Sequence, residues 1–580
     1  MKYHNERALI GTLLAAMLLP SLLLMDVSAT RGWLYALLAA LAFAAARRTL
    51  METEKRLRRY ALGFGFAFML CQLAGARLDA ADTLGGLWPA VKLLVCSLAL
   101  APAGGFGFVL LVRGVEKISL RAQEGVNGHK VFWIVFGCIL LCWLPLFLAY
   151  YPGMFNYDST GEINQIVKNT FDANFPIVHT LLLGVFYRLG EAVGSYNTGI
   201  ALYTIAQCAA LAAAMAYAVQ YLYELRLPRW LWLGVAAVFA LLPVHGMLAM
   251  CTTKDLFFCS ALLPLMVRLH TLWKHPDKWL DWKQCAIVAL LTAAMCFMRT
   301  NGVFSVLAAG IAAIPFFKAH KQARVRLLAS LLAGLVMLGA GTTVLNRICN
   351  PKPGGVREWL SVPLMQVARV YDEAVKDGRE LKEAEEIEAF IPDVDRYQRH
   401  LADGVKKKAT VGVVNMPQYL NLWGRLFWQY PADFFDAAAY LTKGYWHLDD
   451  DTHLDIYAER GDHGYLETKN QDGLGVTRDS KWPGLMQTLD RLFVDNEYRR
   501  IPLLATAMEP AFWCWAVCVV VLLAMYCRER GTILCAMLVI GLFASMLLGP
   551  CSYIRYAYPL ALCAPVLFGL MISQKKELVS

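Results

Sequence analysis

The sequence predicts an all-α polytopic membrane protein that crosses a lipid bilayer about fourteen times. Of its 580 residues, 58% are apolar and only 17% are charged, whereas soluble domains average about 25% charged residues. The mean hydropathy of the chain is +0.45. This composition excludes a soluble enzyme and a disordered chain. The net charge of +10 is not gathered into one patch, so a nucleic-acid-binding protein is excluded as well.

Apolar runs with charged borders divide the chain into three membrane segments. A span needs about 20 apolar residues. The N-terminal segment 1–130 holds four such runs, the core 131–345 holds seven, and the C-terminal segment 505–580 holds three. The predicted spans are 8–25, 32–46, 60–76, 88–112, 131–150, 198–223, 230–245, 255–269, 284–300, 302–317, 327–345, 505–527, 532–550 and 556–572. The stretch 176–190 is also apolar, but we expect it at the membrane interface.

Charges between the runs set the orientation. If the stretch 176–190 does not cross the membrane, the short connecting segments that are richest in Lys and Arg all lie on the same side of the membrane. These include the segments that contain Arg58, Arg113, Arg324 and Lys576. Such segments face the cytoplasm, so both termini are expected there. The run from 8 to 25 also fits a cleaved secretory signal, but its direct continuation into 32–46 favours an uncleaved helix.

The segment 346–504 contains no span and has more acidic than basic residues. We therefore expect an extracytoplasmic domain. Its stretches 361–377, 380–390, 417–429 and 431–444 have the spacing of amphipathic helices, so the domain is predicted to be mostly helical. It has one cysteine, Cys349, at its membrane edge, which excludes a disulfide framework within it.

The first outer loop, 151–197, holds the first candidate for chemistry. Pro152 and Gly153 end the preceding helix, and Ser159 with Glu162 three positions later predicts a capping box that starts a new helix lying on the outer leaflet. Asp158 stands at the entry of this helix. Its carboxylate would take a proton from an acceptor hydroxyl or hold a divalent ion. The structural alternative is that Asp158 only caps the helix.

Several stretches together resemble a known architecture. They are YPGMFNYDSTGEINQ (151–165), His179-Thr180, CTTKDLFF (251–258), MRTNG (298–302), PLMQVARVY (363–371) and GPCSYIRYAYPL (549–560). The chain looks like the GT-C superfamily of integral membrane glycosyltransferases, and more narrowly like a family of bacterial multi-pass proteins of that architecture. The resemblance covers about 131–572 and implies a GT-C-like helix bundle. The four spans before residue 131 look like an addition to it.

The resemblance also implies a chemistry. GT-C enzymes use polyprenyl-phosphate sugars, and Asp158 matches the loop aspartate that is their presumed general base. Many members carry a second acidic residue beside the first, whereas here the neighbour is Ser159. Whether the protein needs a metal is therefore open, and a divalent cation is the one cofactor that the sequence leaves as an alternative. The carboxylate of Glu162 is a further candidate for substrate binding.

Polar residues at the outer ends of later spans form the second set of candidates. Lys254 and Asp255 lie between two apolar runs, Arg299 and Asn301 end one span, and Arg555 opens the last. Cations in this layer would neutralise a departing polyprenyl phosphate. We assign donor-phosphate binding to Lys254, Arg299 and Arg555, and substrate binding to Asp255 and Asn301. The alternative for the cations is snorkelling to lipid headgroups. His179 would donate to the same phosphate or only cap a helix.

The outer segment adds weaker candidates. Gln366 and Arg369 are three residues apart on one predicted helix face, and the resemblance suggests that they face the substrate cavity, whereas a solvated face is the alternative. The run 445–463 is rich in His and Asp, but its spacing fits neither an EF-hand nor an HExxH zinc helix, so a solvated acidic loop is favoured. No Walker loop, dinucleotide fingerprint or GxSxG elbow occurs.

These observations predict a glycosyltransferase. It would move a sugar from a polyprenyl-phosphate donor to an envelope glycan, lipid or protein on the outer side of the membrane. Two rivals stay open. A transporter or flippase of lipid-linked sugar would use the same cations to guide a headgroup, although matching inverted halves are not evident. An envelope polysaccharide polymerase or ligase would use a pyrophosphate-linked oligosaccharide.

Overall fold

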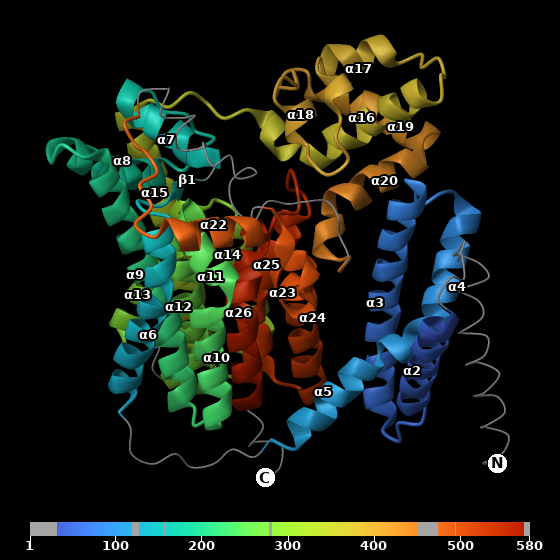
Figure 1. The fold of residues 1–580 in the computed structure, drawn as a ribbon, viewed down its shortest axis with the longest axis horizontal. Coiled ribbons are helices and arrows are strands. Elements are labelled where there is room, and N and C mark those ends of the chain that lie inside the picture. The colour runs from blue at the N-terminus through green and yellow to red at the C-terminus, as the bar shows by residue number, and fades with distance from the viewer. Residues whose placement is uncertain are drawn as a thin grey trace.

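The computed structural model describes residues 32–118, 127–155, 157–277, 281–448, 474–493 and 495–573. Within them every regular element is a helix apart from one pair of two-residue strands. Most helices run along one direction, and a smaller helical unit lies over part of one end of the bundle (Figure 1). We call this end the upper end. The predicted span 8–25, with its signal-peptide alternative, and the residues 449–463 of the acidic run lie outside the described residues.

Among the described residues, eight helices are long and apolar enough to cross a membrane. They are α3 (Lys55–Ala81), α4 with α5 (Leu87–Gly104 and Phe106–Glu116), α6 (Gly128–Ala149), α9 (Tyr196–Glu224), α12 (Lys254–Lys274), α15 (Lys321–Cys349), α24 (Pro510–Cys527) and α26 (Ile554–Ser573). The pair α10 (Arg229–Leu241) and α11 (Pro243–Met250), bent by 42°, makes a ninth if it is one span. The fold is thus all-α with membrane-spanning helices, and the number fourteen stays a prediction.

The other predicted spans in the described residues also fall on helices. They are α2 (Gly32–Leu50) and the shorter apolar helices α13 (Trp282–Met298), α14 (Gly302–Phe316) and α25 (Arg530–Met546). The predicted span 505–527 is divided, because α23 (Pro502–Met508) ends before Pro510, which opens α24. Proline has no N–H to continue a helix but is well tolerated in the first turn.

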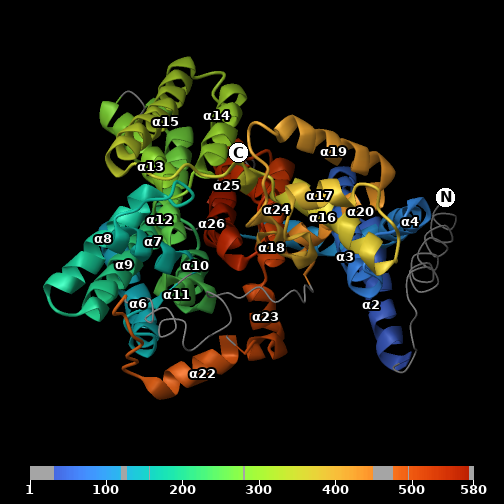
Figure 2. The ribbon, with the colours of Figure 1, turned by 90° about the horizontal axis from the view of Figure 1, so that it is seen from above.

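The centre of the bundle consists of α9, α12 and α26, and the other long helices surround them (Figure 2). Large apolar side chains on the perimeter stay exposed, among them Trp133 and Leu141 on α6 and Val336 and Ile348 on α15. A soluble protein rarely leaves such apolar surface uncovered. A bilayer around these helices accounts for it.

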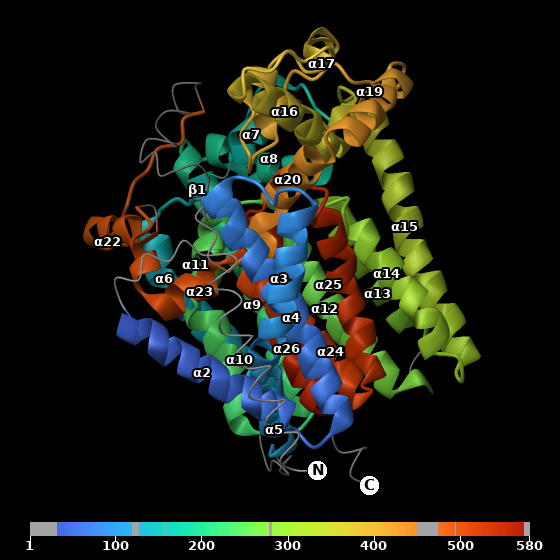
Figure 3. The same cartoon turned by 90° about the vertical axis from the view of Figure 1, so that its right-hand side faces the viewer.

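The N-terminal helices α2 to α5 stand beside α24 at one flank of the bundle (Figures 1 and 3). Their contact with the core is aromatic, because Phe64 and Phe68 of α3 meet the ring of Trp515 at centroid distances of 5.9 and 5.1 Å. Within this group, α3 and α4 approach closely at Gly65, where an added Cβ would lie 2.0 Å from the carbonyl oxygen of Ala101.

The unit at the upper end has its own hydrophobic core. It consists of α16 (Ser361–Lys376), α17 (Ala384–Phe390), α18 (Asp403–Lys406), α19 (Met416–Gln429) and α20 (Pro431–Thr442), and its amphipathic helices match those predicted. Leu364, Tyr419 and Phe434 are fully buried in it. The rest of the segment 346–504 behaves differently. Tyr445 and Phe493, the latter at the end of α22 (Pro483–Phe493), belong to the core of the membrane bundle.

The first outer loop folds against the bundle. Strand β1 (Met154–Phe155) pairs in parallel with β2 (Cys251–Thr252), and α7 (Tyr157–Lys168) and α8 (Ile177–Ala192) follow β1. Helix α7 begins two residues before the predicted cap Ser159. Its apolar face does not lie on lipid as predicted, because Ile163 is fully buried and Ile166 packs at Gly184 of α8. The next helix of the same loop provides the apolar partner.

Candidate functional site

Five charged side chains from four distant parts of the chain meet at the upper end of the bundle. Lys254 Nζ lies 2.8 Å from Asp158 Oδ2, and Arg299 Nη1 lies 2.9 Å from Asp255 Oδ1. Arg555 joins the two pairs, with Nη1 3.7 Å from Asp158 Oδ2 and Nε 3.6 Å from Asp255 Oδ2. We call these five residues the ion cluster. All five were candidates from the sequence.

The strand pair brings the two halves of the cluster together. Met154 is paired with Cys251, so the residues that follow each strand, Asp158 and Lys254, emerge side by side. The Ser159 hydroxyl donates to the Thr252 carbonyl at 2.7 Å. The predicted capping box does not form, because the Ser159 hydroxyl is used in this contact and the Glu162 carboxylate binds His179.

The start of α12 fixes Asp255, the more deeply buried carboxylate of the cluster. The Thr253 side chain caps α12 by accepting a hydrogen bond from the Asp255 N–H, and its hydroxyl lies 3.1 Å from Asp255 Oδ2. A carboxylate in the first turn of a helix is also favoured by the helix dipole. Asp255 is therefore fixed by its own helix as well as by Arg299 and Arg555.

The cluster is largely buried and carries one more cation than anion. The side chain of Asp255 is 2% exposed and those of Arg299 and Arg555 are 10% and 14% exposed, whereas that of Asp158 is 26% exposed. Arg555 Nη1 is buried and donates no hydrogen bond to any described residue. Because an uncompensated buried charge is costly, this arrangement is suited to receiving an anion from outside the protein.

The acid–base state of Asp158 follows from its neighbours. Burial alone would raise the pKa of its carboxyl group, but the charges of Lys254 and Arg555 outweigh burial and hold the pKa well below its ordinary value. Asp158 is thus ionised at neutral pH and is a weak base while both cations contact it.

Two aromatic rings hold the cations in place. The guanidinium carbons of Arg299 and Arg555 lie 5.1 and 5.0 Å from the ring centroid of Tyr556, and Lys254 Nζ lies 5.8 Å from that of Phe175. These are cation–π distances. Sequence reasoning missed both rings as site residues, although Tyr556 lies in the quoted stretch GPCSYIRYAYPL and Phe175 lies directly before the apolar stretch 176–190.

His179 and Glu162 bind each other instead of a member of the ion cluster. His179 is buried, its Nδ1 contacts the Glu162 carboxylate, and its Nε2 is 2.7 Å from the Tyr203 hydroxyl. Both ring nitrogens are occupied, so the predicted phosphate contact by His179 is not available in this arrangement. Glu162 is likewise buried, and its predicted contact with substrate is not available either.

A buried hydrogen-bond network connects this pair to Thr253, the residue before Lys254. The Tyr203 hydroxyl donates to Gln207 Oε1 at 3.0 Å, and the Gln207 amide donates to the carbonyls of Ala249 and Cys251 at 3.0 and 2.7 Å. Gln207 Oε1 also accepts from the Thr253 N–H at 3.2 Å. Gln207 therefore holds the segment that leads into Lys254. A polar residue inside the apolar run 198–223 was the signal that sequence reasoning overlooked.

The remaining candidates do not join the cluster. Gln366 accepts a hydrogen bond from Trp423 Nε1, and Arg369 binds the side chain and carbonyl of Asp82 at the end of α3. Arg369 is buried, so it anchors the upper unit to α3 instead of facing a substrate cavity or solvent. Asn301 stands at the start of α14, half-buried, two residues after Arg299. No described group of three or more His, Cys, Asp or Glu residues is arranged to hold a metal ion.

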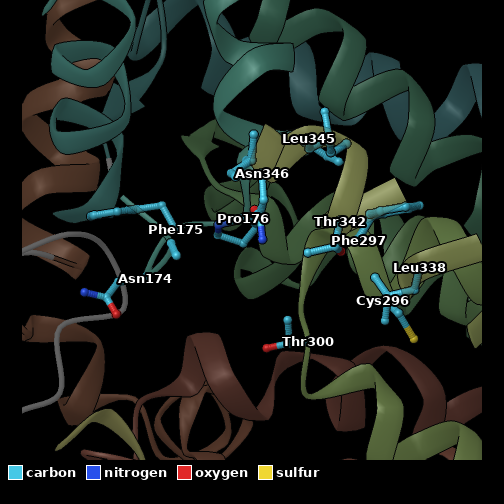
Figure 4. A pocket seen from close by; sticks show the side chains of 13 residues that line it. Asn174, Phe175, Pro176, Cys296, Phe297, Thr300, Leu338, Thr342, Leu345 and Asn346 are labelled. Carbon is cyan, nitrogen blue, oxygen red and sulfur yellow. The ribbon is translucent and has the colours of Figure 1, made fainter. Parts of the chain in front are cut away.

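A cavity of about 160 Å³ is lined by Phe175 and Thr300 (Figure 4). Its walls come from the loop before α8 and from α13 and α15, and they are mainly apolar, with Phe297 and Leu338 opposite Phe175. Asn174, Thr300 and Asn346 add polar groups. Phe175 belongs both to the cavity and to the Lys254 contact, and Thr300 follows Arg299 in the chain.

Comparison with protein families matches residues 167–579 to DUF6020, described as a family of unknown function. The match covers Lys254, Asp255, Arg299 and Arg555 and begins after Asp158. No curated protein and no solved structure matches the chain. Since the matched part is well over half of the chain, the protein belongs to the DUF6020 family.

Proposed function

We propose that this protein is a membrane glycosyltransferase that takes a sugar from a polyprenyl-phosphate donor and attaches it to an envelope glycan, lipid or protein. The observation that carries the proposal is the ion cluster, in which a partly exposed carboxylate stands beside cations that outnumber the carboxylates by one. A polyprenyl phosphate is an anion bound to the membrane. A site of this charge at the end of a membrane bundle suits such a ligand.

The residues have distinct roles in the proposed reaction. Asp158 accepts the proton of the acceptor hydroxyl while that oxygen forms a bond to the anomeric carbon of the sugar. The bond from this carbon to the phosphate oxygen breaks, and its electron pair leaves with the polyprenyl phosphate. Lys254 and Arg555 neutralise the charge that develops on the phosphate. Arg299 adds positive charge to the same cluster, and Asp255 fixes its position.

The membrane arrangement is part of the same proposal. We place the upper end on the outer side of a bacterial cell membrane, both termini in the cytoplasm, and the membrane helices in a GT-C-like bundle of about fourteen spans. The support is the distribution of Lys and Arg between the apolar runs. A donor on the outer side is carried by a lipid and not by a nucleotide.

Sugar transfer by the purified protein tests the function. The assay supplies prenyl-phosphate-linked, labelled hexoses and an envelope extract, and it counts label joined covalently to acceptor. In Asp158→Asn the rate should fall by about 10²- to 10⁴-fold, which is the usual contribution of a general base. Glu191→Gln is the matched control, because Glu191 is exposed on α8 and pairs with Arg188.

Undiminished transfer by Asp158→Asn would remove Asp158 as the base. Movement of the labelled lipid across reconstituted vesicles without any covalent transfer, which is the behaviour of a transporter, would overturn the transferase proposal itself.

A further inference from the structure

The cations that would meet a donor phosphate are already in contact with Asp158. Lys254 Nζ and Arg555 Nη1 both approach the same carboxylate oxygen, Oδ2, at 2.8 and 3.7 Å. A carboxylate and a phosphate present similar oxygen acceptors to an ammonium or a guanidinium group. In this state Asp158 therefore stands where an anionic ligand would find its partners.

Of the two carboxylates in the cluster, only Asp158 is free to leave. Asp255 is 2% exposed and is held by Arg299, Arg555 and the Thr253 hydroxyl. Asp158 is 26% exposed and lies in the first turn of α7, a helix outside the candidate spans. A partly exposed side chain at such a position can change rotamer toward solvent without disturbing the bundle.

The contact with two cations also conflicts with the role of a base. A carboxylate that is hydrogen-bonded to an ammonium group has a reduced affinity for a proton. Asp158 gains proton affinity only when Lys254 and Arg555 turn to another anion. The same event would therefore bind the donor and activate the base.

We propose that Asp158 occupies the anion site of the ligand-free protein and that the donor phosphate displaces it from Lys254 and Arg555, which frees the carboxylate to act as the base. This inference rests on the proposed function. In this proposal Asp158 competes with the donor phosphate for the cations in addition to acting as the base. The apparent affinity for the phosphate is then lowered by the fraction of molecules in which the cations are free of Asp158, which is about tenfold if that fraction is about one in ten.

The affinity for a short prenyl phosphate measures this competition. Geranyl phosphate is titrated into the detergent-solubilised full chain by calorimetry, at fixed pH and ionic strength. Asp158→Asn should bind it about tenfold more tightly than the unchanged protein, because the amide does not compete for the cations. Glu191→Gln removes the same charge from the exposed surface of α8 and should change the affinity less than about twofold.

A double-mutant cycle shows whether the competition runs through Lys254. In a Lys254→Gln background, the gain from Asp158→Asn should shrink to about threefold or less, since one of the two contested cations is gone. A gain of unchanged size in this background would contradict the proposed exchange. A cooperative thermal unfolding transition of each of the four proteins establishes that all of them are folded.

The outcomes separate this inference from the proposed function. If Asp158→Asn binds geranyl phosphate no more tightly than the unchanged protein but loses sugar transfer, the exchange is wrong and the transferase proposal stands. If it binds more tightly but the unchanged protein transfers no sugar, the exchange holds and the transferase proposal fails. If no variant binds geranyl phosphate, both are overturned.

Discussion

Asp255 is the buried anchor of the ion cluster. It contacts both Arg299 and Arg555 and has almost no solvent exposure. Removing its charge leaves two guanidinium groups without their nearest buried counter-charge, and breaking a buried ion pair on one side costs about 3–5 kcal/mol. Asp255→Asn should therefore lower the thermal midpoint of the protein in detergent, followed by tryptophan fluorescence.

An exposed pair provides the control for this substitution. Asp377 is 57% exposed and pairs with Arg379 on the upper unit, so Asp377→Asn should cost less than about 1 kcal/mol. Equal midpoints for the Asp255 and Asp377 variants would show that Asp255 does not stabilise the cluster.

Single residues could be predicted from the sequence where charge is scarce. Lys254, Arg299 and Arg555 stood out because each is a rare charge at the end of an apolar run, and the structure brings them together with Asp158. His179 could not be placed in this way. Its partners Glu162 and Tyr203 depend on how α7, α8 and α9 pack, and no local pattern in the sequence encodes that packing.

Arg369 illustrates the same limit. The spacing of Gln366 and Arg369 correctly predicted one helix, but Arg369 also binds Asp82, which lies far away in the sequence at the end of α3. A residue of an outer helix that binds the membrane part cannot be distinguished from a substrate ligand by periodicity alone.

At the scale of elements, α8 and α9 depend on a close approach of their backbones. A Cβ added at Gly199 would lie 2.3 Å from the Phe186 carbonyl oxygen and 2.9 Å from the Gly190 Cα. These are backbone atoms and cannot move aside cheaply. Gly199→Ala should separate the two helices and cost about 1–3 kcal/mol, the usual range for overpacking, with faster hydrogen exchange in α8.

Gly339→Ala is the matched control for this substitution. Gly339 lies inside the helix α15, and an added Cβ would meet no atom within 4 Å. Alanine is favoured over glycine in a helix by about 0.5–1 kcal/mol, so this variant should be as stable as the unchanged protein or slightly more stable. A Gly199→Ala protein that behaves like the Gly339→Ala protein would contradict the close packing of α8 and α9.

Elements were predictable where apolar periodicity is strong. The spacing of apolar residues placed α16 and α19 within one residue of their observed bounds. It also identified the apolar face of α7 but assigned that face to lipid, whereas α8 covers Ile163 and Ile166. Periodicity shows that a face is apolar and does not show which surface it meets.

At the scale of the whole molecule, composition alone indicated helices in a membrane, because so large an apolar fraction cannot be buried otherwise. The extent of the upper unit was harder to predict. Hydropathy grouped 346–504 as one segment, but Tyr445 and Phe493 pack into the membrane bundle and the unit with its own core is smaller. A segment without a span can still belong to the bundle.

The proposed orientation predicts which surface residues a reagent reaches in intact cells. Lys407 is exposed on the upper unit, and Lys321 is exposed at the other end of α15, the helix that leads up to this unit (Figure 3). A membrane-impermeant thiol reagent should label Lys407→Cys in intact cells but Lys321→Cys only after permeabilisation, each compared with the unchanged chain. The reverse pattern would invert the orientation and place the ion cluster in the cytoplasm.

An experimental structure with a bound prenyl phosphate tests the central claim most directly. The account predicts phosphate oxygens within hydrogen-bonding distance of Lys254 Nζ and Arg555 Nη1, with the Asp158 carboxylate turned away from both. A phosphate bound elsewhere, with the contact of Asp158 to Lys254 intact, would contradict it.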